Sequence, residues 1–179
     1  GGTSSGKTTL LSSLINQVDH NQRIVAIEET SELTSEHPHV VKLLARSSNS
    51  EGAGQITVGE LVKASLRMRP DRIVVGEVRS EEAFDLVQAL NTGHDGSLCT
   101  IHANGPAEVI HRMASLAMFA HPGLDYQAIV NQICFGIDCI IYVKKNRQGR
   151  RYVDSISEIK RSSGSVSVFN METLESVNV

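Results

Sequence analysis

The first nine residues, GGTSSGKTT, are the feature that most limits what this chain can fold into. They match the pattern G-x-x-x-x-G-K-[ST] through Gly1, Gly6, Lys7 and Thr8. Such a loop turns its backbone N–H groups inward around an anion, and the helix that follows directs its positive end at the same anion. Apolar residues recur at helical spacing over residues 7–18. This periodicity argues against a Gly/Ser-rich turn that matches by chance, so the sequence predicts a nucleotide site.

The residue types of the loop indicate their roles. We expect Lys7 to reach the β- and γ-phosphates and the Thr8 hydroxyl to bind Mg²⁺, so the predicted cofactors are ATP and Mg²⁺. The other residues expected to contact the nucleotide are Thr3, Ser4, Ser5, Gly6 and Thr9. A strand usually precedes such a loop and none is present before residue 1, so we expect the sequence to be a fragment that begins inside its domain.

Short apolar runs alternate with amphipathic segments over about the first 135 residues, and meandering strands follow. The periodicity predicts strands at residues 23–27, 40–45, 72–78 and 97–101, and helices at residues 57–68, from 80, from 106 and 125–135. Further strands are predicted at residues 139–143, 152–159 and 166–169, with turns at residues 146–149 and 162–164. We therefore predict one α/β domain over residues 1–179, with a mainly parallel sheet and an antiparallel β extension at residues 138–170.

Two of the predicted strands end in acidic residues, in Ile27-Glu28-Glu29 and in Val75-Gly76-Glu77. Ligands of open α/β sheets lie beyond the carboxyl ends of the strands, so both acids can converge on the phosphates. One acid could polarise the attacking water as a general base, and the other could hold Mg²⁺ directly or through water. Phosphate-loop proteins place a Mg²⁺-binding Asp on such a strand, and here Glu77 must take that part. The alternative is that these acids serve only as caps or in ion pairs.

Histidines and arginines supply further candidates. His94 and His102 bracket the strand at residues 97–101, and His102 lies at its outlet, where it could sense the γ-phosphate. The other histidines are expected to be ordinary polar residues: His20, His37, His39, His111 and His121. Phosphoryl transfer often uses an arginine from a neighbouring subunit. The candidates are Arg46, Arg67, Arg69 and Arg79, each of which could equally form a surface ion pair.

Composition excludes several other classes of protein. The chain of 179 residues has 17 Lys and Arg against 20 Asp and Glu, and it contains no Trp, which argues against a nucleic-acid partner. Cys99, Cys134 and Cys139 form no CxxC pair and lie in apolar runs, which predicts buried thiols rather than a disulfide framework or a zinc site. No apolar window is long enough to span a membrane.

Residues 142–161 contain seven basic side chains against two acidic ones. They are interpreted either as the charged edge of a soluble hairpin or as a docking surface for an acidic partner or lipid headgroups.

Four blocks in this order resemble the ATPases of the type II/type IV secretion superfamily, and look most like those of tight-adherence (Flp-type) pili: GGTSSGKTT, RIVAIEET, LRMRPDRIVVGEVR and NTGHDGSLCTIHANGP. The resemblance runs to about Glu158 and implies a RecA-like domain, a hexameric ring and Mg-ATP hydrolysis at subunit interfaces. It also implies that Glu28 activates water, that Glu77 supports Mg²⁺, and that His94 and His102 are the histidines of the family's His box. The sequence departs from the family where Glu29 replaces the usual Asp, and where Ser4 replaces a common Gly.

The resemblance further implies that the family's N-terminal domain is absent from this sequence. The expected function is Mg-dependent ATP hydrolysis that powers pilus assembly or protein secretion. The motor would be cytoplasmic, at the inner face of the cytoplasmic membrane, with inner-membrane platform proteins as partners. The alternatives are a nucleic-acid translocase with the same core and a nucleotide-binding assembly module without turnover. An ABC-type transporter ATPase is disfavoured because the sequence has no LSGGQ-like signature.

Overall fold

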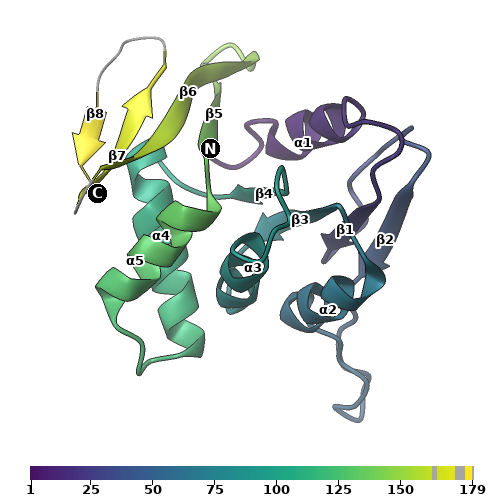
Figure 1. The fold of residues 1–179 in the computed structure, drawn as a ribbon. Helices are drawn as coiled ribbons and strands as arrows, with labels where there is room; N and C mark the ends of the chain where they lie inside the picture. Colours follow the sequence, from purple (N-terminus) through teal and green to yellow (C-terminus); the bar gives the residue numbers. More distant parts are fainter. Residues whose placement is uncertain (163–164, 172–175, 179) are drawn as a thin grey trace.

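Parallel strands and flanking helices build the chain from Lys7 to Gly136 (Figure 1). The computed structural model describes residues 1–162, 165–171 and 176–178. The parallel sheet has the order β2-β1-β3-β4 and consists of β1 (Ile24–Glu28), β2 (Val40–Leu44), β3 (Arg72–Val78) and β4 (Leu98–Ile101). The helices are α1 (Lys7–Ile15), α2 (Val58–Ser65), the 3₁₀ turn η1 (Leu66–Met68), α3 (Glu82–Leu90), α4 (Pro106–Ala120) and α5 (Tyr126–Gly136).

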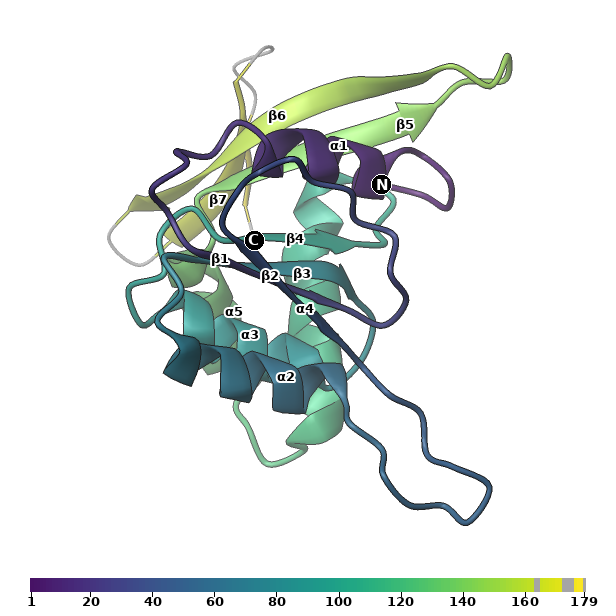
Figure 2. The same cartoon turned by 90° about the vertical axis from the view of Figure 1, so that its right-hand side faces the viewer.

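Helices cover both faces of the parallel sheet, with α1 on one face and α2 to α5 on the other (Figure 2). Alternate residues of β1 serve the two faces. Ile24 and Ala26 belong to the smaller apolar cluster with α1, whereas Val25 and Ile27 belong to the larger cluster with α2 to α5. Because both faces are buried, the strands read as continuous apolar runs without polar alternation.

A second, antiparallel sheet follows α5 and contains β5 (Cys139–Lys145), β6 (Arg151–Ser162), β7 (Ser165–Asn170) and β8 (Ser176–Asn178), in that order. Arg161 of β6 joins this sheet to the end of α5. Its Nε donates to the carbonyl of Cys134 at 2.6 Å, and its Nη2 donates to that of Phe135 at 2.9 Å. A cation at the C-terminal end of a helix also interacts favourably with the helix dipole.

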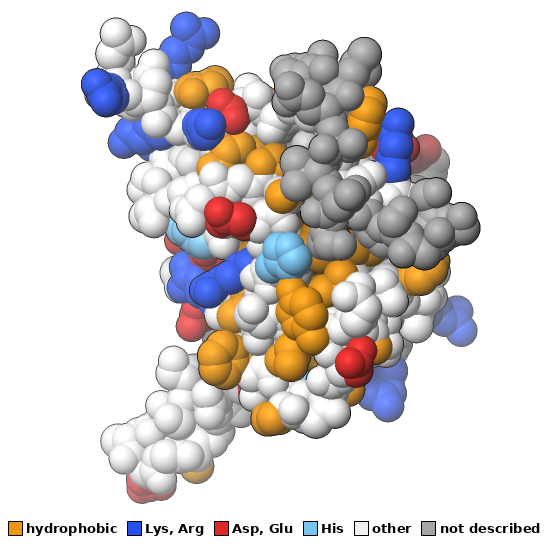
Figure 3. Space-filling model, turned by 90° about the vertical axis from the view of Figure 1, so that its left-hand side faces the viewer, with side chains coloured by type: hydrophobic (Ala, Val, Ile, Leu, Met, Phe, Trp, Pro, Cys, Tyr) orange, Lys and Arg blue, Asp and Glu red, His pale blue; other side chains and the backbone are white. Residues whose placement is uncertain are grey.

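The tip of the β5–β6 hairpin carries exposed basic side chains, namely Lys144, Lys145, Arg147, Arg150 and Arg151. Figure 3 shows Lys and Arg side chains gathered at the upper left of the molecule. Within the hairpin, Lys144 pairs with Asp154 at 2.9 Å, an arrangement typical of the charged edge of a soluble strand pair. A largely apolar cleft of about 550 Å³ lies between β4 and β5, and Gly1 is among the residues that line it.

The predicted fold class, a mainly parallel α/β core with an antiparallel extension, is confirmed. The ends of some helices and strands differ from the predicted ends by a few residues. The first helix ends at Ile15 rather than near residue 18, and the segment at 57–68 divides into α2 and η1. A capping box of Thr57 and Glu60 opens α2, with both of its hydrogen bonds made. Residues 163–164 of the predicted turn at 162–164 lie outside the described residues.

One prediction about the cysteines is wrong. Cys134 is buried and Cys99 is partly buried, but Cys139 is exposed. Its apolar neighbours suggested a core position, yet Cys139 begins β5, an edge strand of the antiparallel sheet, and its side chain is not covered. In the described part of the chain, no helix has the length and apolar character needed to cross a membrane.

Candidate functional site

Residues 1–6 form a tight loop that leads into α1. Ser4 and Gly6 have left-handed backbone conformations, with φ of 55° and 98°. The N–H of Ser5 donates to the carbonyl of Gly2 at 3.4 Å. Other backbone N–H groups of the loop and of the first turn of α1 donate to no acceptor among the residues that the structure describes. They are those of Thr3, Ser4, Gly6, Lys7, Thr8 and Thr9. Free donors at a helix N-terminus are the groups that bind anions in proteins.

The Lys7 ammonium extends from α1 across the loop to the end of β4. Its Nζ donates to the carbonyls of Gly1 at 3.2 Å and Gly2 at 3.0 Å, and lies 3.1 Å from Nε2 of His102. Burial lowers the pKa of Lys7, while Glu77 acts in the opposite direction. The positive charge is therefore placed at the loop, beside His102 at the end of β4 and near Glu77 of β3.

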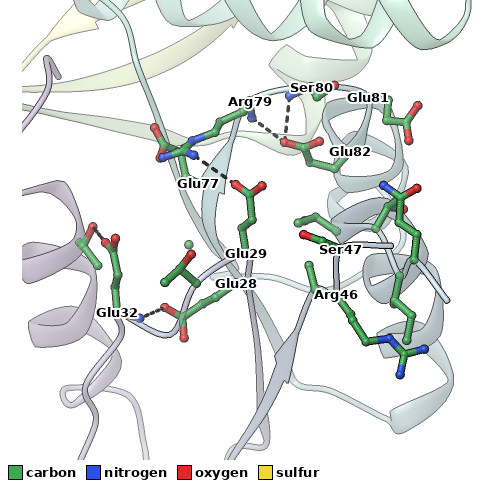
Figure 4. Close-up of a pocket in the computed structure, with 18 residues that line it drawn as sticks. Glu28, Glu29, Glu32, Arg46, Ser47, Glu77, Arg79, Ser80, Glu81 and Glu82 are labelled. Carbon is green, nitrogen blue, oxygen red and sulfur yellow. Dashed lines mark hydrogen bonds and ion pairs between the residues drawn. The ribbon is translucent and has the colours of Figure 1, made fainter. Parts of the chain in front are cut away.

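A cavity of about 420 Å³ opens beside the loop at the carboxyl ends of β1 and β3 (Figure 4). Thr8 lies on its wall, together with Gly76 at the end of β3. The pairing of β3 with β4 shifts register between Val75 and Val78, a local irregularity of the kind common at functional sites. Six carboxylates line the cavity: Glu28, Glu29, Glu32, Glu77, Glu81 and Glu82.

Glu28 is buried, with only 3% of its surface exposed. Its Oε1 accepts the backbone N–H groups of Glu32 at 2.8 Å and Leu33 at 2.7 Å. Its Oε2 is also buried but has no hydrogen-bond partner within the described ranges. Gly76 leaves room for this side chain, because a Cβ at that position would come within 3.2 Å of the Glu28 Cγ. One oxygen of Glu28 is thus fixed and the other is available.

Glu77 lies between an arginine and a histidine. Its Oε2 accepts from Nε of Arg79 at 2.7 Å and also contacts Nη2. Nη1 of Arg79 donates to Glu29 at 3.1 Å, so the guanidinium joins two acids of the cavity. Oε1 of Glu77 lies 2.7 Å from Nε2 of His102, but the approach is not aligned for a hydrogen bond, which leaves Oε1 without a hydrogen-bond partner in the described chain.

His102 lies at the end of β4, in contact with both Lys7 and Glu77. Burial lowers the pKa of His102, and the charge of Lys7 lowers it further, while Glu77 raises it. Its usual pKa is about 6.5, so the ring is mainly neutral at neutral pH. Protonation would place a second cation beside the Lys7 ammonium.

The structure brings together most of the predicted site residues and separates the rest. Lys7, Thr8, Glu28, Glu29, Glu77, Arg79 and His102 gather around the loop and the cavity. His94 instead lies before the amino end of β4, where its Nδ1 is 3.1 Å from the Ala89 carbonyl. Arg67 and Arg69 precede β3 and lie at its opposite end. Arg46 lines the cavity and donates to the carbonyl of Gly54 at 2.6 Å.

Two residues at the site escaped the sequence analysis. Glu32 accepts from the Thr8 hydroxyl at 3.4 Å, and Figure 4 shows Glu32 at one side of the cavity. The sequence feature that could have identified Glu32 is its position in the loop after β1, a strand that ends in acidic residues. Arg151 of β6 donates from Nε to the carbonyl of Ser4 at 3.0 Å. These two residues are 147 positions apart in the chain, so no local pattern could have joined them.

Known proteins share this fold and much of this sequence. The chain is 48% identical over 166 residues to a "Putative conjugal transfer protein" of Mycobacterium tuberculosis, covering 93% of this chain and 47% of that protein. It is 38% identical over 143 residues to VirB11 of Agrobacterium fabrum, covering 79% of this chain and 41% of that protein. The chain thus spans less than half the length of these relatives.

Among solved structures, the VirB11 ATPase of the Brucella suis type IV secretion system superposes with a TM-score of 0.78 at 29% identity, over 88% of this chain and 46% of that one. The Legionella pneumophila ATPase DotB matches with a TM-score of 0.61 at 27% identity, over 84% of this chain and 41% of that one. A family model described as type II/IV secretion system protein matches residues 1–164. The chain therefore belongs to the type II/IV secretion system protein family.

Proposed function

We propose that this chain binds Mg-ATP at the loop of residues 1–9 and hydrolyses it as part of a secretion motor. The observation that carries the proposal concerns one edge of the sheet, where backbone N–H donors lie close to a buried carboxylate oxygen. Neither the donors nor this oxygen has a hydrogen-bond partner among the residues that the structure describes. Free N–H groups at a helix N-terminus suit phosphates, and an available carboxylate suits proton abstraction. The match to ATPases of secretion systems supports the same chemistry.

The residues divide into a binding group and a reacting group. The loop N–H groups and the Lys7 ammonium hold the phosphates, while Glu28, with Oε1 fixed by two N–H groups, accepts the proton of the attacking water at Oε2. His102 lies between Lys7 and Glu77, where it responds to the charge of the terminal phosphate. Glu77 and Glu29 of the same chain hold the Arg79 guanidinium. The arginine that acts on the nucleotide of a neighbouring subunit is therefore one of Arg46, Arg67 and Arg69.

The donor set also fits Mg²⁺, a cation that prefers oxygen ligands. Thr8 offers a hydroxyl, and Glu77 offers Oε1, which is buried and has no hydrogen-bond partner among the described residues. When bound, Mg²⁺ neutralises phosphate charge and polarises the transferred group. Glu32, which contacts Thr8, is placed to hold the Thr8 hydroxyl in position.

We further propose a homo-oligomeric ring, a hexamer by the resemblance noted above, at the inner face of the cytoplasmic membrane with inner-membrane platform proteins as partners. The names of the relatives bear on the process that the motor would drive: they place VirB11 in type IV secretion and another relative in conjugal transfer. Secretion is therefore favoured over pilus assembly. The excess of acidic residues and the scarcity of aromatic ones favour a protein partner over nucleic acid.

The test uses the protein at its natural full length. Lys7→Ala should weaken Mg-ATP binding by about tenfold or more, since a charge-assisted contact is lost. Glu28→Gln should lower kcat by about 10²- to 10⁴-fold while Mg-ATP affinity is kept, because general-base catalysis alone is removed. Glu51→Gln, on an exposed loop, is the matched control. Affinity is measured by titration with a fluorescent ATP analogue, and turnover by phosphate release.

Each contrary outcome has a distinct meaning. Undiminished binding by Lys7→Ala contradicts the phosphate role of the loop, and wild-type turnover by Glu28→Gln contradicts the general base. Ring formation with ATP binding but no turnover in the wild type would identify an assembly module. Hydrolysis that DNA stimulates, and that weakens steeply with salt, would identify a nucleic-acid translocase.

A further inference from the structure

The β5–β6 hairpin lies directly against the outer side of the phosphate-binding loop. The carbonyl of Val143 in β5 packs so closely on Gly1 that no side chain would fit there. The side chain of Arg151 in β6 covers the other end of the loop, where a Cβ on Gly6 would come within 3.0 Å of its Cδ. An element that lies more than a hundred residues after the loop in the chain thus supports that loop.

Arg151 makes a specific polar contact as well as this packing. Its Nε donates to the carbonyl of Ser4 at 3.0 Å. Ser4 has a φ of 55°, a conformation that non-glycine residues rarely adopt. A trans peptide is planar, with its C=O and N–H pointing in opposite directions. By holding the Ser4 carbonyl on the outside, Arg151 therefore directs the N–H of Ser5 toward the inside of the loop, where it donates to the Gly2 carbonyl at 3.4 Å and closes the turn.

We propose that Arg151 is a positioning residue of the nucleotide site, which holds the loop of residues 1–6 in the curved form that presents its N–H groups. The inference rests on the proposed nucleotide-binding function, and it extends the site to a strand of the antiparallel sheet. The geometry favours arginine over lysine. The aliphatic Cδ packs over Gly6 while the adjacent Nε reaches Ser4, and a lysine ammonium lies farther along its side chain.

The experiment compares Arg151→Ala, Arg151→Lys and Arg150→Ala in the full-length protein. Arg150 is exposed and adjacent in sequence, and only its backbone makes a hydrogen bond within the described chain, so it is the control for charge at the hairpin. Arg151→Ala should raise KM and the Kd for Mg-ATP about tenfold and leave kcat within about twofold, since the loop is loosened while Glu28 is untouched. Arg151→Lys should recover part of the affinity, and Arg150→Ala should resemble the wild type.

A second measurement needs no nucleotide. Amide hydrogen exchange of the peptide covering residues 1–10 should be faster in Arg151→Ala than in the wild type, and unchanged in Arg150→Ala. Faster exchange confined to this peptide supports the positioning role. Wild-type exchange and affinity in Arg151→Ala, or an equal loss in Arg150→Ala, would overturn it. If the wild type itself bound no nucleotide, the proposed function would fail, and the exchange comparison would still decide the role of Arg151.

Discussion

The phosphate-binding loop and the acidic edge of the sheet meet at one site but are built in different ways. The loop offers backbone N–H groups, so its ligand groups depend on main-chain geometry, including two left-handed residues, Ser4 and Gly6. The acidic edge offers carboxylates whose positions depend on other side chains and on burial, as with Glu28 at the end of β1. We therefore expect nucleotide binding by the loop to be sensitive to side chains added to its backbone. Turnover should instead be sensitive to small displacements of the carboxylates at the acidic edge.

Among substitutions that alter the shape of the two regions without removing a proposed functional group, the largest expected effect is at the loop. Gly6→Ala should weaken Mg-ATP binding by about tenfold or more, because an alanine at a φ of 98° is strained by about 1–2 kcal/mol and its Cβ would crowd Arg151. Titration with a fluorescent nucleotide measures the change. Gly52→Ala is the control, since it has a φ of 76° but open space around it. Equal losses in both variants would mean that backbone strain alone, rather than loop geometry, explains the result.

The next effect is at the acidic edge. Gly76→Ala should lower kcat about tenfold and leave the Kd for Mg-ATP nearly unchanged, because the added Cβ lies 3.2 Å from the Glu28 Cγ and shifts that carboxylate slightly. Single-turnover kinetics separates this change in chemistry from binding. Gly123→Ala, where nothing lies within 4 Å, should behave as the wild type. A loss of affinity without loss of kcat would erase the distinction between the two regions.

A smaller effect concerns the stability of the loop. Ser4→Gly should stabilise the folded state by about 0.5–1 kcal/mol, since glycine adopts a φ of 55° without strain, although it also gains entropy in the unfolded chain. The free energy of unfolding in urea provides the measurement. The carbonyl that Arg151 contacts is kept in this variant, so nucleotide affinity should be unchanged. A marked destabilisation would show that the serine side chain, rather than the backbone, matters at this position.

The smallest effect is a pH dependence at the acidic edge. Burial and Lys7 lower the pKa of His102 in the folded state, so the unfolded state binds this proton more readily. Stability should therefore be lost as the pH falls below the unfolded value of about 6.5, with no contribution above it. Urea unfolding between pH 7.5 and pH 5 should show a slightly steeper decline for the wild type than for His102→Gln. If the free energy of unfolding changed with pH in the same way in both proteins, the lowered pKa of His102 would be contradicted.

Much of the site could be predicted because its residues carry local signals. Lys7 and Thr8 belong to a contiguous motif, and Glu28 and Glu77 each end an apolar run that is recognisable as a buried strand. Parallel strands end at the same edge, so their convergence followed from the fold class. His94 shows the limit of this reasoning. It shares a short segment with His102, but the four residues of β4 separate the two histidines and place them at opposite ends of the strand.

By itself, the sequence determined the parallel α/β core, the anion-binding loop and the acids beside it, because periodicity and a contiguous motif act over a few residues. The arrangement of the side chains within the site follows from the tertiary structure. It fixes Oε1 of Glu28 and leaves Oε2 without a hydrogen-bond partner in the described part of the chain. It also joins Arg79 to Glu77 and Glu29, and places Arg151 on the loop. The contacts of Arg79 with Glu29 and of Arg151 with Ser4 join residues far apart in the chain, which no local pattern encodes. Those of Glu28 with Leu33 and of Arg79 with Glu77 are local, but they depend on how the chain turns after each strand.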